Sequence, residues 1–347
     1  MTQTQLPLVA ITMGDPGGIG PEVIVKAFAS PDMFKHCRPF VIGDRLTMQR
    51  AVGTLGAALS ILPVEDSETR HIPCSSSMIP LLSMGNLSEA DIDYGRPSPA
   101  ACKATVAFIE RALEIALSGK ADAICTCPVN KAQLHANGFP FPGHTEFIRF
   151  MAGAGDVVMM LAGPKLRVAL ATIHEPLAKV PALLTKERLR GTIRITAQAL
   201  RKDFGIVSPR IAVAGLNPHA GEAGKFGREE LEIIQPVVGE FADSSHFRIS
   251  GPWPADTLFY RAFSGEFDAV VAMYHDQGLI PVKLAHFNDA VNVSLGLPIV
   301  RTSVDHGTAY DIAGSGKADP GSLMAAIRLA SFIAENRLRY RAESEST

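Results

Sequence analysis

The sequence predicts an α/β protein with a mostly parallel sheet that is covered by helices on both faces. Short apolar runs, rich in residues that favour strands, alternate with segments of helical periodicity along almost the whole chain. The runs are continuous rather than alternating in polarity, which is typical of strands buried on both faces. They cover residues 8–13, 39–42, 121–125, 157–161, 166–173, 210–216 and 268–274.

The first run leads through a glycine-rich turn, residues 13–22 (MGDPGGIGPE), into a predicted helix with Pro21 in its first turn. The turn lacks the G-x-G-x-x-G spacing, because Gly18 and Gly20 are followed by Val23. It also lacks the Lys-Ser/Thr pair of a phosphate-binding loop. A dinucleotide-binding motif of the Rossmann type is therefore not supported, and we expect a tight active-site turn.

A helix is predicted over residues 101–120, where apolar side chains recur at helical spacing and Gly119 favours a stop. Residues 63–99, by contrast, are rich in Ser, Pro and Met and show no clear periodicity. A pair of edge strands with loops is one interpretation of that stretch. The sequence leaves the structure of residues 50–95 open.

Composition excludes several classes of protein. The formal net charge is -2 and no block of five like charges occurs, so the basic stripe that nucleic-acid binding requires is absent. No apolar run approaches the ~20 residues that span a bilayer. The first residues lack the basic and apolar regions of a signal peptide. We therefore expect a cytoplasmic protein with neither nucleic acid nor membrane as a partner.

Three histidines share one sequence context, because each follows an apolar run. His174 follows LRVALATI, His219 follows RIAVAGLNP, and His275 follows DAVVAMY. In open α/β sheets ligands bind beyond the carboxyl ends of the strands, so three imidazoles there could converge on one metal ion. An acidic residue follows each histidine within three positions, as is common beside metal-bound histidines. Ordinary loop histidines, each with one hydrogen bond, are the alternative.

A second group of polar residues lies in the loop PFPGHTEF, where prolines and glycines fix the backbone around His144 and Thr145. Such a loop could hold two polar groups toward a ligand. Thr145 could instead cap a helix that begins near Glu146. Both interpretations are compatible, since a capping position also offers backbone N–H groups to an anion.

Lys283, Asn292 and Arg301 follow one another at intervals of nine residues. A lysine, an arginine and an amide donor can clamp a phosphate or a carboxylate. Solvated surface charge is the commoner role of such residues. Each lies among apolar residues here, however, so each needs a partner or a ligand.

Two motifs resemble the isocitrate and isopropylmalate dehydrogenases. Residues 13–24 (MGDPGGIGPEVI) are similar to the GDGIGPEV opening of those enzymes, and residues 306–320 (HGTAYDIAGSGKADP) resemble their cofactor-binding loop. Within that superfamily the sequence most resembles the 4-hydroxythreonine-4-phosphate dehydrogenase family. PFPGHTEF, LNPHAGE, PADTLF, AMYHDQG and VNVSLGLPIVRTSVDHGTA follow its pattern, and only the stretch near residues 50–95 matches poorly.

The resemblance implies the site residues. The family's metal-binding histidines fall on His174, His219 and His275, and in the family the third ligand comes from the partner subunit of a homodimer. Its substrate contacts fall on His144, Thr145, Lys283, Asn292 and Arg301. Acidic residues near the substrate fall on Asp256 and Asp276. The loop resemblance implies NAD contacts at His306, Gly307, Asp311, Gly314 and Asp319.

The resemblance also implies two α/β/α domains with the active site in the cleft between them. We expect residues 1–125 with 300–347 to form the first domain, on the cofactor side. Residues 126–299 would form the second, which carries the metal, substrate contacts and the dimer interface.

The expected reaction is NAD-dependent oxidation of 4-phosphooxy-L-threonine to the 3-oxo acid. Loss of CO₂ then gives 3-amino-2-oxopropyl phosphate, in pyridoxal 5'-phosphate (vitamin B6) biosynthesis. Three neutral histidines suit zinc as the Lewis acid, with cobalt, manganese and magnesium as alternatives. Asp256, Asp276 and Lys283 are the candidates for the proton acceptor.

Several alternative activities fit parts of the same pattern. A paralogous dehydrogenase would act on 4-phospho-D-threonate or 4-phospho-D-erythronate, and the segment YHDQGLIPVKLAHF leans toward it. A branch that oxidises aromatic cis-dihydrodiols is disfavoured by the intact GHTE loop. A metal-dependent phosphatase would use the same residues and leave NAD untouched. A non-catalytic sensor would bind the ligand without turnover.

Overall fold

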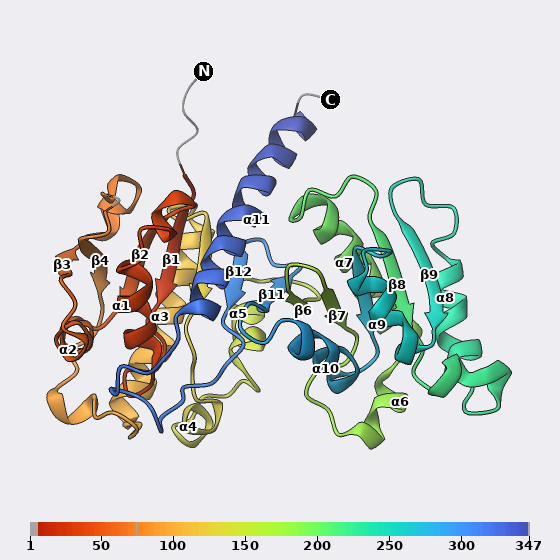
Figure 1. The fold of residues 1–347 in the computed structure, drawn as a ribbon, viewed down its shortest axis with the longest axis horizontal. Helices are drawn as coiled ribbons and strands as arrows, with labels where there is room; N and C mark the ends of the chain where they lie inside the picture. Colours follow the sequence, from red (N-terminus) through yellow and green to blue (C-terminus); the bar gives the residue numbers. More distant parts are fainter. Residues whose placement is uncertain (1–5, 74, 346–347) are drawn as a thin grey trace. The chain divides into compact units, whose positions relative to one another are not determined.

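The computed structural model describes residues 6–73 and 75–345 and confirms the α/β fold with mostly parallel strands. The chain forms two compact units. Unit 1 comprises Met1–Ala154 with Leu297–Glu335, and unit 2 comprises Gly155–Gly296 with Asn336–Thr347. Each unit has its own strands and its own helices (Figure 1).

Unit 1 is built on six parallel strands in the order β3-β4-β2-β1-β5-β12. The predicted apolar runs at 8–13, 39–42 and 121–125 are confirmed as strands, and every residue of β1, β2 and β5 is buried. This burial explains why those runs are apolar throughout. The strands are β1 (Leu8–Thr12), β2 (Arg38–Gly43), β3 (Ser60–Pro63), β4 (Met78–Ser83), β5 (Ala123–Thr126) and β12 (Val300–Ser303).

The helices of unit 1 cover its strands. In Figure 1 α1 lies in front of the strands and α3 behind them, and α3 contacts β1, β2 and β5. The helix predicted over 101–120 is confirmed as α3, which begins at Pro99 because the Ser98 side chain accepts a hydrogen bond from the N–H of Ala101. The helices are α1 (Gly20–Phe28), α2 (Arg45–Leu55), α3 (Pro99–Leu117), α4 (Lys131–Ala136), α5 (His144–Met151) and α11 (Gly321–Glu345).

The stretch that the sequence left open completes this sheet. Helix α2 begins where the Asp44 carboxylate accepts a hydrogen bond from the N–H of Thr47, and it ends at Gly56 in the left-handed conformation. Strand β3 lies at the edge, and β4 pairs between β3 and β2. Short 3₁₀ turns, Asp66–His71 and Glu89–Asp91, connect these elements.

Unit 2 is built on six strands in the order β11-β6-β7-β10-β8-β9. Strand β6 is antiparallel to both β11 and β7, and the remaining pairs are parallel. The predicted runs at 157–161, 166–173, 210–216 and 268–274 are confirmed as β6, β7, β8 and β10. The strands are β6 (Val158–Ala162), β7 (Arg167–Leu170), β8 (Arg210–Ala214), β9 (Arg248–Trp253), β10 (Ala269–Ala272) and β11 (Val291–Leu295).

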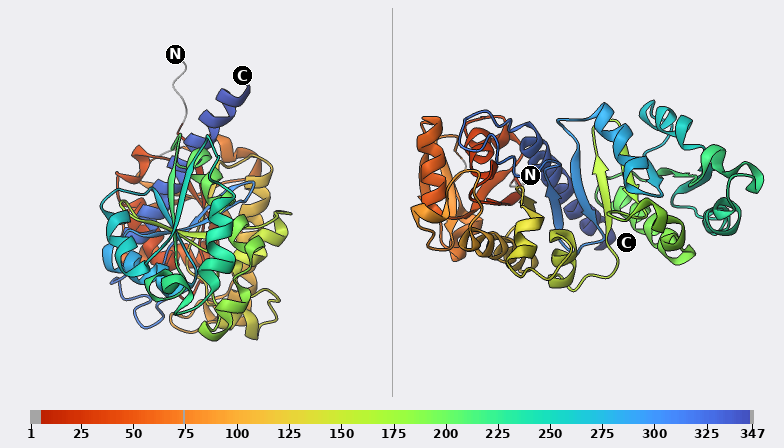
Figure 2. Two further views of the ribbon diagram at one scale, coloured as in Figure 1. Left: turned by 90° about the vertical axis from the view of Figure 1, so that its right-hand side faces the viewer. Right: turned by 90° about the horizontal axis from the view of Figure 1, so that it is seen from below.

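Helices lie on both sides of the strands of unit 2, as the left view of Figure 2 shows. Side chains of α9 and α10, such as Leu258 and Leu279, pack into a buried cluster with Leu170 and Val270 of the strands. Helix α7 contacts β6, β7 and β11. None of the helices in the described ranges is long and apolar enough to cross a membrane. The helices are α6 (Val180–Leu183), α7 (Lys186–Lys202), α8 (Gln235–Gly239), α9 (Ala255–Phe263) and α10 (His275–Ala285).

The two units differ in extent from the expected domains. Residues 126–154 fall in unit 1, where α4 and α5 contact α3, although we expected the second domain to begin at residue 126. The end of α11 falls in unit 2, because Asn336 and Arg337 bind Asp203. The Arg337 guanidinium lies 2.7 Å from the Asp203 carboxylate in a buried ion pair.

Candidate functional site

The strands that precede the three histidines are neighbours in unit 2. Strand β10 pairs in parallel with β7 on one side and with β8 on the other. His174 follows β7, His219 follows β8, and His275 follows β10 as the first residue of α10. Parallel neighbours end at the same edge of a sheet, so the fold brings all three histidine loops to one edge, as predicted.

His174 and His275 lie side by side at this edge. Their ring centroids are 5.5 Å apart and the ring planes are inclined by 42°. The Nδ1 atom of His275 lies 2.7 Å from the Asp276 carboxylate, which fixes the orientation of the ring. A carboxylate on one ring nitrogen leaves the other nitrogen to face a metal ion, which is the usual arrangement of metal-bound histidines.

His219 lies on a different kind of segment. It begins a left-handed turn in which His219, Ala220, Glu222 and Ala223 all have positive φ, between 42° and 56°. This conformation costs a residue with a side chain about 1–2 kcal/mol, and strain of this kind concentrates at functional sites. The ring of His219 lies 6.1 Å from that of Phe226. Within residues 6–73 and 75–345 of one chain, no three histidine, cysteine or acidic residues come close enough to hold a metal ion.

Hydrogen bonds join the three loops to one another. The Thr172 hydroxyl donates to the carbonyl of Met273 at 2.7 Å and so ties the end of β7 to the end of β10. The Gln277 side chain accepts from the N–H of Met273 and donates to the carbonyl of Gly215, both at 2.7 Å. Gln277 thereby joins the loop of His275 to the loop of His219. We did not predict Thr172 or Gln277, although Gln277 stands two residues after His275 in the motif HDQG.

Arg301 is the most deeply buried of the predicted substrate residues. It lies on β12 in unit 1 with 1% of its surface exposed, and its Nη2 donates to the Thr126 hydroxyl at 2.9 Å. Burial lowers the pKa of Arg301 to about 10, which still leaves it charged at neutral pH. A buried guanidinium that binds a neutral hydroxyl suits a site for an anion.

His144 and Thr145 form the first turn of α5 in unit 1. The helix begins at His144 with Gly143 as its N-cap, so the alternative in which Thr145 caps a helix starting near Glu146 is wrong. The reason is that the extended backbone of Gly143, with φ -165°, starts the helix two residues earlier. Both side chains are half-buried in this turn, and the N-terminus of a helix favours an anion.

Lys283 and Asn292 lie in unit 2. Lys283 is half-buried in the last turn of α10. Asn292 lies on β11, and its buried Oδ1 accepts no hydrogen bond from any described residue. A buried polar atom without a partner is rare in native proteins and indicates a ligand or water at that position. The five predicted substrate residues are thus divided between the two units.

The acidic candidates are both exposed. Asp256 lies in the first turn of α9, and Asp276 lies in the first turn of α10. Asp276 is bound to His275 as described above. Its carboxylate therefore orients the His275 ring.

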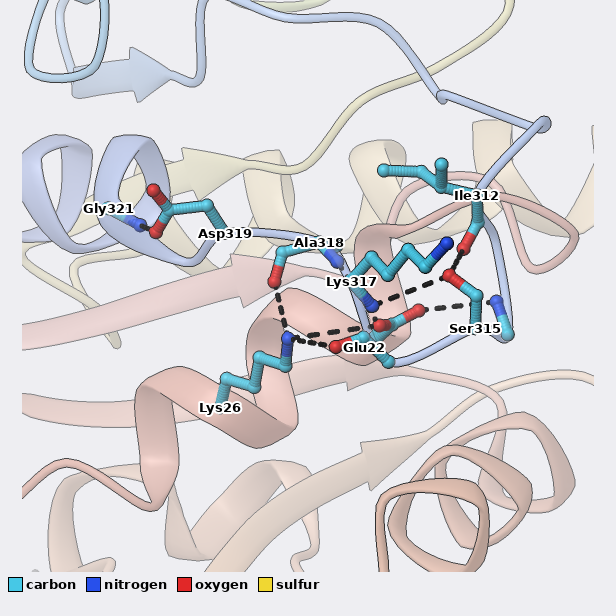
Figure 3. A network of polar contacts seen from close by, with 10 residues as sticks. Glu22, Lys26, Ile312, Ser315, Lys317, Ala318, Asp319 and Gly321 are labelled. Atoms are coloured by element: carbon cyan, nitrogen blue, oxygen red, sulfur yellow. Dashed lines mark hydrogen bonds and ion pairs between the residues drawn. The ribbon is translucent and has the colours of Figure 1, made fainter.

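The loop that resembles a cofactor-binding loop is held against α1 in unit 1 (Figure 3). The Glu22 carboxylate accepts hydrogen bonds from the N–H groups of Gly314 and Ala318. The Lys26 ammonium donates to the carbonyls of Gly316 and Ala318, at 2.8 and 2.5 Å. The turn that includes Glu22 and the loop that includes Gly314 are the two motifs that carried the resemblance to dehydrogenases.

The two motifs also meet at a second point. The Tyr310 hydroxyl donates to the Asp15 carboxylate at 2.6 Å, and burial together with this carboxylate raises the pKa of Tyr310. The N–H of Ile19 donates to the carbonyl of Thr308. A side chain on Gly18 would lie 2.9 Å from that carbonyl, which explains the glycine. The glycine-rich turn therefore serves as a platform for the loop.

The predicted cofactor residues take different positions in this loop. The Nε2 atom of His306 is buried and has no hydrogen-bond partner among the described residues, so it is available to a ligand. Gly307 and Asp311 are exposed. Gly314 has a φ of 75° and packs on Tyr94, where a side chain would lie 2.3 Å from the ring. The Asp319 carboxylate accepts a hydrogen bond from the N–H of Gly321 and so stabilises the start of α11.

Comparison with known proteins adds to this geometry. Residues 35–330 match the family described as pyridoxal phosphate biosynthetic protein PdxA. A 4-hydroxythreonine-4-phosphate dehydrogenase of Trichlorobacter lovleyi is 48% identical over 96% of this chain and 99% of its own. A D-threonate 4-phosphate dehydrogenase of Cupriavidus necator is 46% identical over 96% of this chain and 98% of its own. The crystal structure of a 4-hydroxythreonine-4-phosphate dehydrogenase of Klebsiella pneumoniae is similar with a TM-score of 0.87 and 38% identity, covering 96% of this chain and 99% of that one.

Proposed function

The chain belongs to the pyridoxal phosphate biosynthetic protein PdxA family, and on this premise we propose that it is a cytoplasmic 4-hydroxythreonine-4-phosphate dehydrogenase. It would oxidise 4-phosphooxy-L-threonine with NAD⁺ and a divalent metal ion. The resulting 3-oxo acid would lose CO₂ to give 3-amino-2-oxopropyl phosphate. The observation that carries the proposal is the edge formed by β7, β10 and β8, where His174 and His275 lie side by side.

The histidines fit a divalent metal ion. Two neutral imidazoles at this spacing, one of them oriented by Asp276, are donors that zinc favours, and cobalt, manganese or magnesium stay open. When bound, the metal ion would supply Lewis acidity toward the substrate hydroxyl and NAD⁺ would accept the hydride. His174, His219 and His275 would hold the ion, with the third histidine coming from the partner subunit of a homodimer. This arrangement accounts for the lack of a three-ligand group within one chain.

The substrate would be anchored by charges and amides that the fold already holds in place. Arg301 and the first turn of α5 would bind the phosphate or carboxylate, and Asn292 would orient a polar group with its unpartnered Oδ1. One of Asp256, Asp276 and Lys283 would take the alcohol proton. Lys283 is the half-buried member of these three, which suits a group that exchanges a proton with a bound substrate.

The cofactor would bind at the loop of residues 306–320. The buried Nε2 of His306 offers it a polar contact, and the hydrogen bonds from Glu22 and Lys26 keep the loop backbone in one conformation. Gly307 and Asp311 lie at the exposed side of this loop. Gly314 and Asp319 would help to hold the loop in its conformation, since each forms a hydrogen bond within unit 1.

A homodimer would bury an apolar cluster at the end of α10, formed by Ile280 and Leu284 of the helix and by Phe287 just after it. These three side chains are 66%, 88% and 78% exposed and recur at positions i, i+4 and i+7. Monomers rarely expose such a cluster of large apolar side chains. Because His275 begins the same helix, a second copy on this face would lie beside a metal site that one chain leaves incomplete.

Replacing Arg301 with methionine is expected to raise the KM for the phosphorylated substrate about 10–100-fold, since a hydrogen-bonded ion contact contributes roughly 1.5–3 kcal/mol. The melting temperature should stay the same or rise, because methionine fills a similar volume without a buried charge. Initial rates of NADH formation and thermal melts would measure both. Arg96→Met, at an exposed position in unit 1, is the matched control. An unchanged KM would remove Arg301 from the substrate site.

The similarity to a D-threonate 4-phosphate dehydrogenase makes 4-phospho-D-threonate the second candidate substrate. The related acid 4-phospho-D-erythronate is a further candidate. NADH formation would be followed by its absorbance with these two acids and with 4-phosphooxy-L-threonine. We expect the highest kcat/KM for 4-phosphooxy-L-threonine. Phosphate release without NADH would instead identify a metal-dependent phosphatase, and binding without turnover would identify a sensor.

A further inference from the structure

The left-handed turn that carries His219 encloses a buried carboxylate. Glu230 has 2% of its surface exposed. Its Oε1 accepts hydrogen bonds from the N–H groups of Leu216 and Asn217, at 2.8 and 2.7 Å. Its Oε2 accepts from the Asn217 side-chain amide at 2.9 Å. Among the described residues no cation forms an ion pair with Glu230, so the segment just before His219 supplies the donors that stabilise this charge.

The turn is shaped to fit around this carboxylate. A Cβ atom on Gly221 would lie 2.6 Å from the Oε2 of Glu230. A Cβ atom on Gly215 would lie 2.9 Å from the backbone of Ala220 and 3.3 Å from the Oε1 of Glu230. Both glycines therefore let the backbone close onto the carboxylate. A side chain at either position would force the turn away from Glu230.

The backbone is unusual on both sides of the contact between Glu230 and the turn. Glu230 begins a π-helical segment, Glu230–Ile234, and such segments occur frequently at functional sites. The turn itself has six consecutive residues with positive φ, 219–224, of which only Gly221 and Gly224 are glycines. Four residues with side chains adopt this conformation only where surrounding contacts hold them there. The three hydrogen bonds to Glu230 hold Leu216 and Asn217, the residues that lead into this turn.

The same turn is tied to the rest of the candidate metal site. Gly215 accepts from Gln277, which also binds the backbone just before His275. A change in the turn would therefore change where His219 lies relative to the edge that carries His275. Glu230 is itself too deeply enclosed to reach a substrate, so it acts through His219.

We propose that Glu230 is a positioning residue that holds the His219 ring in the orientation required for metal binding. This inference rests on the metal site of the proposed function. It predicts that loss of the Glu230 carboxylate weakens metal binding, and that turnover falls only because less metal is bound.

The test is Glu230→Gln, which keeps the size of the side chain but places an NH₂ group against the donors of the turn. We expect zinc, measured by competition with a chelating dye in the absence of substrate, to bind about 10–100-fold more weakly. Saturating zinc should restore kcat, and the KM for substrate should not change. Hydrogen exchange should rise in residues 216–224. Glu232→Gln, an exposed position of the same π-helical segment, is the matched control and should behave like the unaltered protein.

An unchanged zinc Kd in Glu230→Gln would overturn the proposal, and so would lost activity that saturating zinc does not restore. If Glu230→Gln does not fold, Asn217→Ala removes one of the three donors from a half-buried position and should weaken zinc binding in the same way. Normal zinc binding by Asn217→Ala would then overturn it. His275→Ala separates this inference from its premise. If His275→Ala retains zinc, the proposed metal site is wrong. If His275→Ala loses zinc but Glu230→Gln binds it normally, only the proposed role of Glu230 is wrong.

Discussion

Replacing His275 with alanine is expected to remove the bound metal ion and to lower kcat/KM at least about 10³-fold. The Lewis acid contributes several kcal/mol to the transition state, and about 1.4 kcal/mol corresponds to a factor of ten. His275 lies beside His174 and is oriented by Asp276, so its loss removes one of the proposed ligands of the ion. Metal content by mass spectrometry and the rate of NADH formation measure the two effects together.

The control for this variant is His246→Ala, because His246 is an exposed histidine of unit 2 away from the ends of β7, β8 and β10. It should retain metal and activity. Full activity of His275→Ala without metal would contradict the proposed site. His219→Ala should match His275→Ala in both measurements, since the proposal gives both residues the same role.

Replacing Leu284 with aspartate is expected to convert the homodimer into monomers and to remove metal and activity with it. The side chain is 88% exposed in one chain, so the substitution costs the isolated chain little, whereas in a dimer it would bury an unpaired charge. Sedimentation velocity at several protein concentrations would give the oligomeric state. Zinc binding and turnover would be measured on the same samples.

Val207→Asp is the matched control, because Val207 is 83% exposed in unit 2 but precedes β8 and so lies away from α10. It should leave the dimer and its activity unchanged. A Leu284→Asp variant that stays dimeric would place the interface elsewhere. A monomeric variant with full zinc occupancy would show that one chain is sufficient for the metal site.

Much of the fold could be predicted because its signals are local. Continuous apolar runs predicted β1, β2 and β5 of unit 1 and β6, β7, β8 and β10 of unit 2, but not β9, β11 or β12. The order of strand and helix predicted a mostly parallel sheet. The stretch from Arg45 to Ser83 was harder, because β3 is a half-exposed edge strand without a continuous apolar run. The N-cap residue Asp44 and the glycine at the C-terminal end, Gly56, are nevertheless sequence signals from which α2 could be predicted.

The histidines could be placed at one edge of the sheet from the sequence because each follows an apolar run that forms a strand, and these strands are parallel neighbours. The residues that hold the histidine loops in place could not be predicted from the sequence. Gln277 binds Gly215 and Glu230 binds Leu216 across more than ten residues, and such contacts are set by tertiary structure rather than by local pattern. The cofactor contact of Asp319 stays a prediction, since its exposed carboxylate accepts one hydrogen bond, from the N–H of Gly321.

The most direct test of the account is NADH formation from 4-phosphooxy-L-threonine by the purified protein before and after removal of metal. We predict that treatment with a chelator abolishes both NADH formation and the release of CO₂. Added zinc, or another divalent ion that the histidines accept, should restore both in the unaltered protein but not in His219→Ala. NADH formation that continues at the full rate in metal-free protein would contradict the account.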